Sequence, residues 1–274
     1  MGRHPRTAVL GPLAGTASGT VLALVAGVLA TAPTTTAVTT AATTSSAVAR
    51  PLPSHVKTSP RVRQMVTVTS PGWRTTRATL RAWQRPPGGR WRQVRGPVPV
   101  RIGYGGWVRG PARRQGTGTS PAGKYALPRA FGSRADPGGT TPYRRFDRND
   151  FWPYEPRDPA TYNVYQRHQA AGTHWRRGYR ERLWDFRAQY RYAVVVGFNL
   201  PSGVHYSRAR RQWVARQRAD TSRGGGIFLH VNGSGATAGC VSMGVRPMRW
   251  LVRWLDPAKR PRVAMGPHRF VKRL

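Results

Sequence analysis

The residues best suited to chemistry lie in one stretch of the chain, residues 224–243, with the sequence GGGIFLHVNGSGATAGCVSM. This stretch holds Cys240, the single cysteine of the chain, and His230, which precedes it by ten residues at the end of a short apolar run. A cysteine thiol has an ordinary pKa of about 8.5, so it needs a base or a positive field to become a nucleophilic thiolate. The imidazole could supply that base if the intervening glycine-containing segment folds back. The spacing is thus compatible with nucleophilic catalysis by a thiol.

The glycine-containing sequence around Cys240 is compatible with two interpretations of the cysteine, a catalytic one and a structural one. Gly239 lets the backbone approach closely, so that amide N–H groups beside Cys240 could face a developing oxyanion. A lone cysteine is also common as a small buried hydrophobic residue, and a lone histidine as a surface or hydrogen-bonded one. Spacing alone leaves both interpretations open, so the rest of the chain has to decide between them.

The charge balance of the chain is extreme. Its 274 residues include 46 basic and 9 acidic ones, a formal net charge of +37. Such a field favours polyanionic partners such as nucleic acid, anionic lipid or phosphate-bearing wall polymers, and an arginine-rich compositional bias with a solvated surface explains it equally well. The arginines are scattered singly and in pairs, and no zinc-finger, basic-zipper or RNA-binding signature occurs. We therefore expect no nucleic-acid partner.

The N-terminus indicates the compartment. Arg3, His4 and Arg6 give a positive start, the following apolar stretch is densest over residues 21–29, and residues 30–32 read Ala-Thr-Ala. This pattern predicts a secretory signal peptide over residues 1–32. An uncleaved anchor is the alternative, although about ten apolar residues are short for a membrane span of ~20. We expect the protein in the cell wall or on the outer face of the cytoplasmic membrane, where an unpaired thiol is buried, intermolecular or reactive.

Composition divides the rest of the chain. Residues 33–60 are rich in Ala, Thr and Pro and predict a linker, so the folded domain is expected over residues 61–274. Residues 132–185, rich in Pro, Tyr, Trp and Arg, predict a long irregular insertion with a short helix near its end. A helix is predicted over residues 247–255, and apolar periodicity predicts strands at residues 62–68, 78–83, 91–94, 98–102, 124–127, 192–198, 227–231 and 262–265. The predicted fold class is mainly β with one or two short helices.

Three motifs carry a resemblance to a known family. Residues 226–243 resemble the active-site segment of the YkuD-type L,D-transpeptidases, especially exported actinobacterial members, in which a strand-borne histidine precedes a glycine-containing loop and Ser/Thr-x-Gly-Cys-Val/Ile. The matching residues are His230, Thr237, Gly239, Cys240 and Val241. Residues 115–125 are similar to the GDGxTPxGxY turn and strand of that family, and residues 192–199 to the partner of its histidine-bearing strand. The resemblance extends from about Val62 to the C-terminus.

The resemblance implies a β-sandwich or barrel and a cysteine-dependent acyl transfer on peptidoglycan stem peptides. Cys240 would be the nucleophile and His230 its base. The backbone carbonyl of Val231 would orient the imidazole, and backbone N–H groups around Ala238, Gly239 and Cys240 would form the oxyanion hole. The thiolate would attack the third stem residue of a donor tetrapeptide and release D-alanine, and a side-chain amine of a second stem would resolve the acyl-enzyme. No metal or cofactor is implied.

The chain departs from the family pattern on either side of the cysteine, which bears on substrate recognition. Ala238 stands where the family often has histidine, and Ser242 where it often has arginine or asparagine. An L,D-carboxypeptidase and a catalytically impaired wall-binding protein are therefore alternatives, whereas a secreted nucleic-acid binder rests on charge alone. A basic neighbour such as Arg246 could recognise the substrate carboxylate. The side chains predicted to contact substrate are those of Thr237, Ser242, Tyr143 and Trp152.

Overall fold

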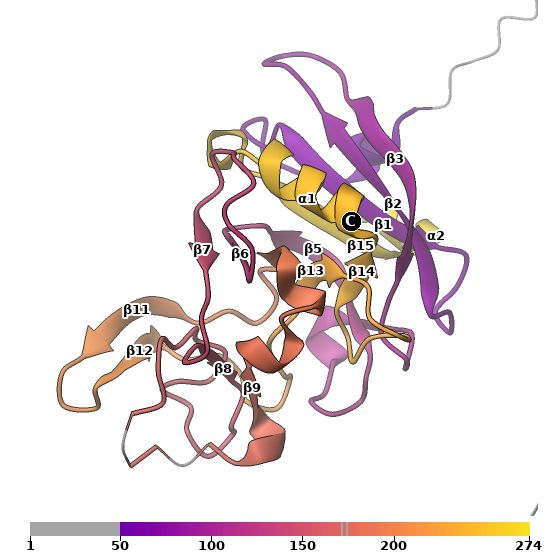
Figure 1. The fold of residues 1–274 in the computed structure, drawn as a ribbon. Coiled ribbons are helices and arrows are strands. Elements are labelled where there is room, and N and C mark those ends of the chain that lie inside the picture. The colour runs from indigo at the N-terminus through magenta and orange to yellow at the C-terminus, as the bar shows by residue number, and fades with distance from the viewer. Residues whose placement is uncertain (1–49, 171, 174) are drawn as a thin grey trace, which may run out of the picture. The chain divides into compact units, whose positions relative to one another are not determined.

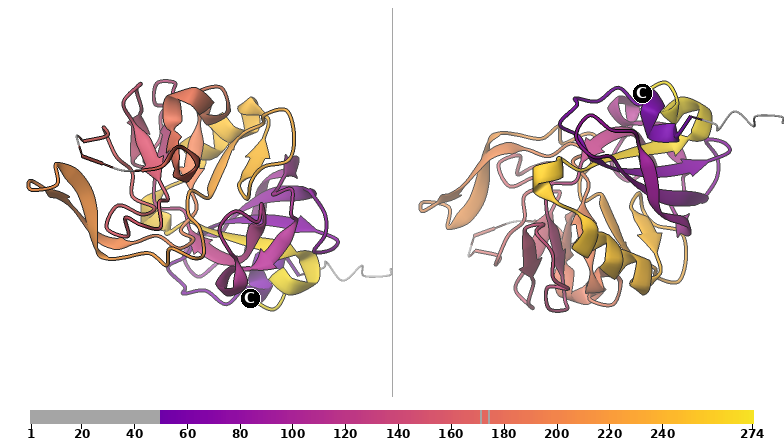
Figure 2. Two further views of the ribbon diagram at one scale, coloured as in Figure 1. Left: turned by 90° about the horizontal axis from the view of Figure 1, so that it is seen from below. Right: turned by 90° about the horizontal axis from the view of Figure 1, so that it is seen from above.

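The computed structural model describes residues 50–274 except residues 171 and 174. These residues form a mainly β fold with two short α-helices, as predicted, and Figures 1 and 2 show it from three directions. The strands are β1 Gln64–Ser70, β2 Arg77–Gln84, β3 Arg92–Arg101, β4 Trp107–Arg109, β5 Ser120–Ala126, β6 Ala130–Gly132, β7 Tyr143–Arg145, β8 Phe151–Pro153, β9 Arg180–Arg182, β10 Ala193–Val195, β11 Ser202–Ser207, β12 Gln212–Gln217, β13 Phe228–Val231, β14 Val241–Met243 and β15 Arg262–Pro267. The helices are α1 Val245–Trp254 and α2 His268–Val271, with short 3₁₀ turns at Leu52–His55, Gly110–Ala112, Arg177–Tyr179, Leu183–Phe186, Gln189–Arg191 and Pro257–Lys259.

Eleven of the strands form one mixed sheet in the order β4-β5-β15-β1-β2-β3-β14-β13-β10-β6-β7. Strand β1 is parallel to β15 and antiparallel to β2, and all seven of its residues are buried. Distant parts of this order enclose one core, because Val66 of β1 and Leu229 of β13 belong to the same buried cluster. A sheet that closes over its own apolar face in this way has the packing of a sandwich.

Helix α1 closes the main core. Met248, Leu251 and Val252 are buried on one side of it, which is the apolar face that the sequence predicted. The helix begins at Val245, two residues earlier than expected, and it ends before Pro257, which cannot continue a helix. Figure 1 shows α1 lying over the strands that carry the candidate site.

The predicted strand over residues 192–198 is only partly a strand. Its first half is β10, which pairs with β13 on one side and β6 on the other. Beyond it the backbone leaves the ladder, and the Gly197 N–H donates instead to the carbonyl of Ala126, 2.8 Å away. A Cβ on Gly197 would lie 3.1 Å from that carbonyl oxygen, so glycine permits the close approach. The apolar residues of this run are nevertheless buried, as their apolar character indicates.

The region predicted as an irregular insertion, residues 132–185, contains the short strands β7, β8 and β9. Strands β8 and β9 pair with each other, and Trp152 of β8 packs edge-on against Phe228 of β13 with 4.8 Å between ring centroids. Tyr190 and other aromatic side chains complete this second core. The insertion is thereby attached to the strand that carries His230. The hairpin β11–β12, which the sequence analysis did not anticipate, projects from the body in Figures 1 and 2.

Residues just before the predicted domain start belong to the packed body. Residues 52–55 form a 3₁₀ turn, and Val56 is buried in a small core with Trp91 and Val271. The predicted signal peptide and residues 33–49 of the predicted linker lie outside the described residues. In the part of the chain that the structure describes, no helix has both the length and the apolar character that crossing a membrane requires.

Candidate active site

The two residues predicted to do chemistry lie on adjacent parallel strands. His230 belongs to β13, and Cys240 directly precedes β14, which runs beside β13 with His230 opposite Ser242 (Figure 1). By this register Cys240 lies opposite Phe228. Residues that are opposite in a parallel pair, or two apart on one strand, point to the same face of a sheet. Cys240 and His230 therefore share one face, while Leu229 between them in register points into the main core.

The thiol of Cys240 is half-buried and hydrogen-bonded to backbone. Its sulfur accepts from the Phe228 N–H and donates to the Gly226 carbonyl, each at 3.3 Å. Burial raises the pKa of this thiol to about 12, and the negative charge of Glu181 adds to the effect, whereas the Phe228 N–H and Arg113 oppose it. The resting thiol is therefore protonated.

The imidazole of His230 is held in one tautomer. Nδ1 lies 2.8 Å from the carbonyl oxygen of Val231, and because a carbonyl only accepts, Nδ1 must carry the hydrogen. The lone pair of the neutral ring is then on Nε2. Burial lowers the pKa of this histidine to about 4, so the ring is neutral at neutral pH. The carbonyl that the resemblance implied as the orienting group is the one that binds Nδ1.

The loop before the thiol is fixed at several points. Thr237 Oγ1 donates to the Cys240 carbonyl at 2.6 Å and accepts the Gly239 N–H at 3.2 Å. Gly239 has a φ of +137°, and a Cβ there would lie 2.8 Å from the carbonyl oxygen of Thr119 and 3.0 Å from Arg113 Nη2. Both the backbone conformation and the available space therefore require glycine directly before the cysteine.

A cavity of about 720 Å³, here called the thiol pocket, opens beside Cys240. Its lining includes Ala238 next to the cysteine and the charged side chains of Arg113 and Glu181, with Tyr104 and other aromatic groups. This volume lies within the range of ordinary small-molecule and peptide sites. The thiol is therefore reachable by a ligand, even though burial keeps it neutral.

Arg113 is a residue of the candidate site that the sequence analysis did not single out. It is only 4% exposed, and Nε and Nη1 donate to the carbonyls of Thr119 and Arg223 at 2.9 and 2.6 Å. Among the described residues no carboxylate lies within ion-pair distance of it. Desolvation lowers its pKa and the Cys240 thiolate would raise it, because the two charges attract. Burying a guanidinium without a carboxylate partner costs free energy. The position of Arg113 beside the thiol therefore makes it a candidate for stabilising negative charge there.

Glu181 and Tyr190 form a second unpredicted feature of the site. Glu181 lines the thiol pocket, and the Tyr190 hydroxyl donates to its Oε2 at 2.6 Å. The Tyr190 ring packs edge-on against His230, with 5.4 Å between centroids and an interplanar angle of 86°. Burial raises the pKa of Glu181 to about 7, partly offset by the tyrosine bond. The tyrosine thus contacts both an acid of the pocket and the candidate base.

Asn163 connects the insertion to the thiol. This buried residue accepts the Trp152 indole N–H at 2.8 Å and the Gly226 N–H at 2.9 Å through the same oxygen. The carbonyl of Gly226 in turn accepts the thiol hydrogen. No local pattern around Asn163 indicates this role, because its partners are 11 and 63 residues away.

None of the four side chains predicted to contact substrate lines the thiol pocket. Trp152 is 1% exposed within the aromatic core, and Ser242 is fully buried in β14. The Tyr143 hydroxyl donates to the Arg134 carbonyl at 2.9 Å. Thr237 instead binds the backbone of the loop before the thiol. Arg246 is exposed in the first turn of α1 and does not line the thiol pocket, whereas Arg113 does.

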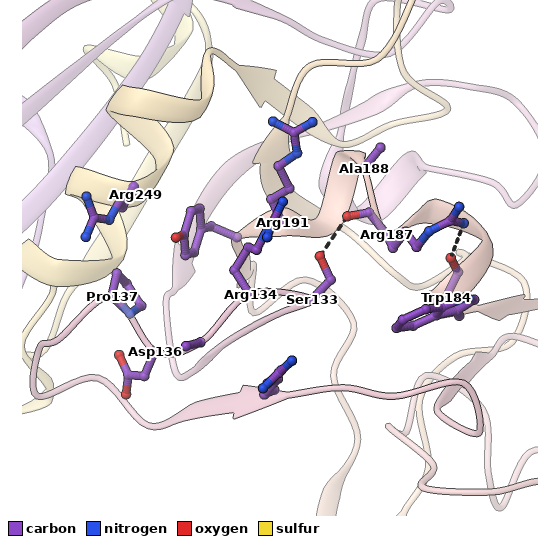
Figure 3. Close-up of a pocket in the computed structure, with 12 residues that line it drawn as sticks. Ser133, Arg134, Asp136, Pro137, Trp184, Arg187, Ala188, Arg191 and Arg249 are labelled. Atoms are coloured by element: carbon purple, nitrogen blue, oxygen red, sulfur yellow. Dashed lines mark hydrogen bonds between the residues drawn. The ribbon is translucent and has the colours of Figure 1, made fainter.

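A second cavity, here called the arginine pocket, has about 730 Å³ and is shown in Figure 3. Its lining is dominated by the exposed arginines Arg134, Arg145, Arg187, Arg191 and Arg249. Asp136 is the carboxylate of this lining, and no cysteine or histidine contributes to it. Within the described residues no group of three or more His, Cys, Asp or Glu side chains is arranged to hold a metal ion. The arginine pocket can therefore attract anions, whereas the thiol pocket holds the nucleophile.

Comparison with known families agrees with the class of site. The model of the YkuD family, described as the L,D-transpeptidase catalytic domain, matches residues 88–264. This is more than half of the chain and includes Cys240, His230, Arg113 and Glu181, so the chain belongs to that family. It is an enzyme of the L,D-transpeptidase type, a family that acts on peptidoglycan stem peptides. No curated protein and no solved structure matches the chain.

Proposed function

We propose that this protein cross-links peptidoglycan stem peptides by acyl transfer through Cys240, with His230 as the general base. The observation that carries the proposal is the neutral pair on one sheet face. A protonated thiol lies at the wall of a cavity, and Nδ1 of the neighbouring imidazole is bound to a carbonyl, which leaves the Nε2 lone pair for the thiol proton. Such a pair supports nucleophilic catalysis without a metal.

In the first half-reaction, the thiol hydrogen leaves the Gly226 carbonyl and turns to His230, whose Nε2 takes the proton as Sγ attacks the carbonyl carbon of the third stem residue. Collapse of the tetrahedral intermediate breaks the peptide bond to the terminal D-alanine, which leaves with the proton from the imidazolium. The product is a thioester on Cys240. Because burial favours the neutral forms of both groups, proton transfer accompanies attack and is not complete in the resting enzyme.

The oxyanion of that intermediate forms beside the Gly239–Cys240 peptide. Since the Gly239 N–H already donates to Thr237, the Cys240 N–H is the better backbone donor to the oxyanion. Arg113 Nη2 adjoins Gly239 and adds positive charge there.

The proposal is tested by the mass of the intact protein after incubation with a stem tetrapeptide. The wild type is expected to gain the mass of the acyl group and to release D-alanine. Cys240→Ala is expected to do neither, a rate loss on the order of 10⁴-fold or more. His230→Gln is the matched control for the base, with circular dichroism to verify that both variants fold. Cross-linked dimer formation by Cys240→Ala at the wild-type rate would contradict the proposal.

Two alternative functions use the same fold and are separated by the same assay. An L,D-carboxypeptidase would form the acyl-enzyme and discharge it to water, so D-alanine and free tripeptide would accumulate without dimer. A catalytically impaired wall-binding protein would show no mass change. The half-buried thiol in a pocket of peptide size favours turnover over binding alone.

Export and an anionic wall partner belong to the same proposal. The predicted signal peptide supports a location in the cell wall or on the outer face of the cytoplasmic membrane, with membrane contact only through an uncleaved N-terminal segment. The arginine pocket of Figure 3 supports binding of a phosphate-bearing wall polymer. N-terminal sequencing of protein recovered from the wall fraction tests the cleavage at residues 30–32.

A further inference from the structure

The thiol pocket contains one carboxylate, and its presence there is unusual for this chain. Nine acidic residues face 46 basic ones in the sequence. Every ion pair among the described residues uses another acid, namely Glu155, Asp158, Asp185 or Asp256. Glu181 lines the pocket that also contains Cys240, and it makes no ion pair with a basic side chain of the described residues. Asp136, Asp147, Asp150 and Asp220 also make no ion pair among the described residues, so what sets Glu181 apart is its place in the thiol pocket, where a cationic ligand can reach it.

The position of Glu181 is fixed by both backbone and side chain. Its strand, β9, pairs with β8 so that Glu181 lies opposite Trp152, which is anchored in the aromatic core. Oε2 accepts the hydroxyl of the fully packed Tyr190, and Oε1 has no hydrogen-bond partner among the described residues. One carboxylate oxygen is therefore held in place and the other can accept a ligand hydrogen.

This carboxylate does not help the first half-reaction. Its negative charge raises the pKa of the Cys240 thiol, so it opposes formation of the thiolate that attacks the donor. The second half-reaction has the opposite requirement. A primary amine has a pKa of about 10.4 and arrives as an ammonium ion, which cannot attack until it loses a proton. A fixed carboxylate attracts that cation and can remove its proton.

We infer that Glu181 is the acceptor site of the enzyme, where it binds the side-chain ammonium of the incoming stem and acts as the general base of deacylation. The inference rests on the proposed function, because it requires an acyl-enzyme on Cys240. It adds a binding residue for the acceptor ammonium, and it assigns the removal of the ammonium proton to a residue separate from His230.

The protons and electron pairs of this step balance. The ammonium gives one proton to Glu181, and the nitrogen lone pair then forms a bond to the thioester carbonyl carbon. The attached nitrogen gives a second proton to Nε2 of His230 as the intermediate collapses and the C–S bond breaks. The sulfur leaves with the electron pair of that bond and takes the proton from the imidazolium. The products are the cross-link amide, the Cys240 thiol and a protonated Glu181, which returns its proton to water.

The electrostatics of the carboxyl agree with this role. Burial raises the pKa of Glu181 to about 7, while the bond from Tyr190 acts in the other direction. A base of such a pKa is ionised in part at neutral pH and releases the acquired proton readily, which is the condition for efficient general base catalysis. A merely structural carboxylate would need only its bond to Tyr190.

Glu181→Gln tests the inference, because glutamine keeps the size and can still accept from Tyr190 but is neither charged nor basic. The acyl-enzyme is formed with a stem tetrapeptide and then discharged by Nα-acetyl-L-lysine, whose side chain is an ammonium, or by hydroxylamine, which is uncharged at neutral pH. We expect discharge by the lysine derivative to slow about a hundredfold or more. Discharge by hydroxylamine should change less than about threefold, because that nucleophile needs no prior deprotonation.

Each outcome has one meaning. Unchanged discharge by Nα-acetyl-L-lysine, or equal loss with both nucleophiles, overturns the inference, since equal loss indicates a structural role. Absence of an acyl-enzyme in the wild type instead overturns the proposed function. Asp185→Asn is the matched control, because it removes one negative charge from an exposed residue nearby and should alter neither discharge. Should Glu181→Gln fail to fold, Glu181→Asp keeps the charge but shortens its reach, and the same selective loss for the lysine derivative is expected.

Discussion

The thiol pocket and the arginine pocket have nearly equal volumes, about 720 and 730 Å³, and both contain charged side chains of either sign. They differ in how those charges are held. In the thiol pocket Arg113 is buried between backbone carbonyls, and Glu181 is bound by a buried tyrosine. In the arginine pocket the arginine residues are exposed to water. The two cavities therefore have nearly the same size, but the charged groups of the first are fixed by hydrogen bonds and those of the second are exposed to solvent.

This difference has a physical consequence. A charge that is fixed and shielded from solvent acts strongly on a nearby reacting group, whereas exposed charges are screened over about 10 Å at ordinary salt. Buried charges should therefore change the rates of bond making and breaking. Exposed charges should change only the salt-dependent attraction of an anionic partner. Substitutions in the two pockets are expected to differ accordingly.

The largest difference is expected at Arg113. Replacing it by glutamine removes the positive charge beside Gly239, so the thiolate and the oxyanion both lose stabilisation. Acylation by the stem tetrapeptide should slow about a hundredfold, the usual effect of losing one strong oxyanion donor. Single-turnover mass spectrometry measures this rate. Arg114→Gln is the matched control, because Arg114 is exposed and adjacent in sequence. Equal slowing by both substitutions would mean that net charge alone is responsible.

The importance of Arg113 also shows where reasoning from the sequence ends. His230, Gly239 and Cys240 could be singled out as candidates because they lie within one short motif, in which the backbone conformation before the cysteine requires glycine. Arg113 is one of 46 basic residues, and its significance arises from carbonyls at Thr119 and Arg223 that only the folded chain brings to it. Local spacing contains no information about such a contact.

The fold was predictable to a similar extent. Period-two apolar patterns located β1 and β2, and the helix signals located α1, because each depends on neighbouring residues. Burial without pairing was not distinguishable from a strand, as residues 196–198 show. Aromatic residues gave the same ambiguity, since Trp152 is part of the core while Tyr104 lines the pocket. Long-range packing decides between these outcomes, and it leaves no local trace in the sequence.

A smaller effect, on pH dependence, is expected for Tyr190→Phe. The tyrosine hydroxyl stabilises the charged form of Glu181, so removing it should raise the pKa of that carboxyl above about 7. The basic form exists above the pKa, and the acidic limb of the discharge by Nα-acetyl-L-lysine should therefore move to higher pH. Tyr154 and Cys240, the other titratable groups that act on this acid, stay neutral there because burial raises the pKa of both.

The pH–rate profile of discharge measures this shift directly. Hydroxylamine again provides the comparison, since its attack does not depend on Glu181 and its profile should keep the wild-type acidic limb. Arg180 and Arg182, the basic side chains of β9 that flank the acid, are the same in both proteins and cannot produce the difference. An acidic limb that moves to lower pH, or that moves equally for both nucleophiles, would show that Tyr190 does not set the pKa of the base for discharge.

The smallest effect on catalysis is expected in the arginine pocket. The double substitution Arg134→Gln with Arg191→Gln should leave the acylation rate unchanged but weaken binding to inorganic polyphosphate, used as a probe for phosphate-bearing polymers. The slope of log K against log salt should fall by about one for each phosphate group that the variant no longer binds.

The matched control is the double substitution Arg208→Gln with Arg216→Gln, which removes the same charge from two exposed arginines at the β11–β12 hairpin. If that control weakens binding equally, the attraction belongs to the net charge of +37 and not to the pocket. If only the first pair does so, the exposed arginines define a docking surface distinct from the site of chemistry.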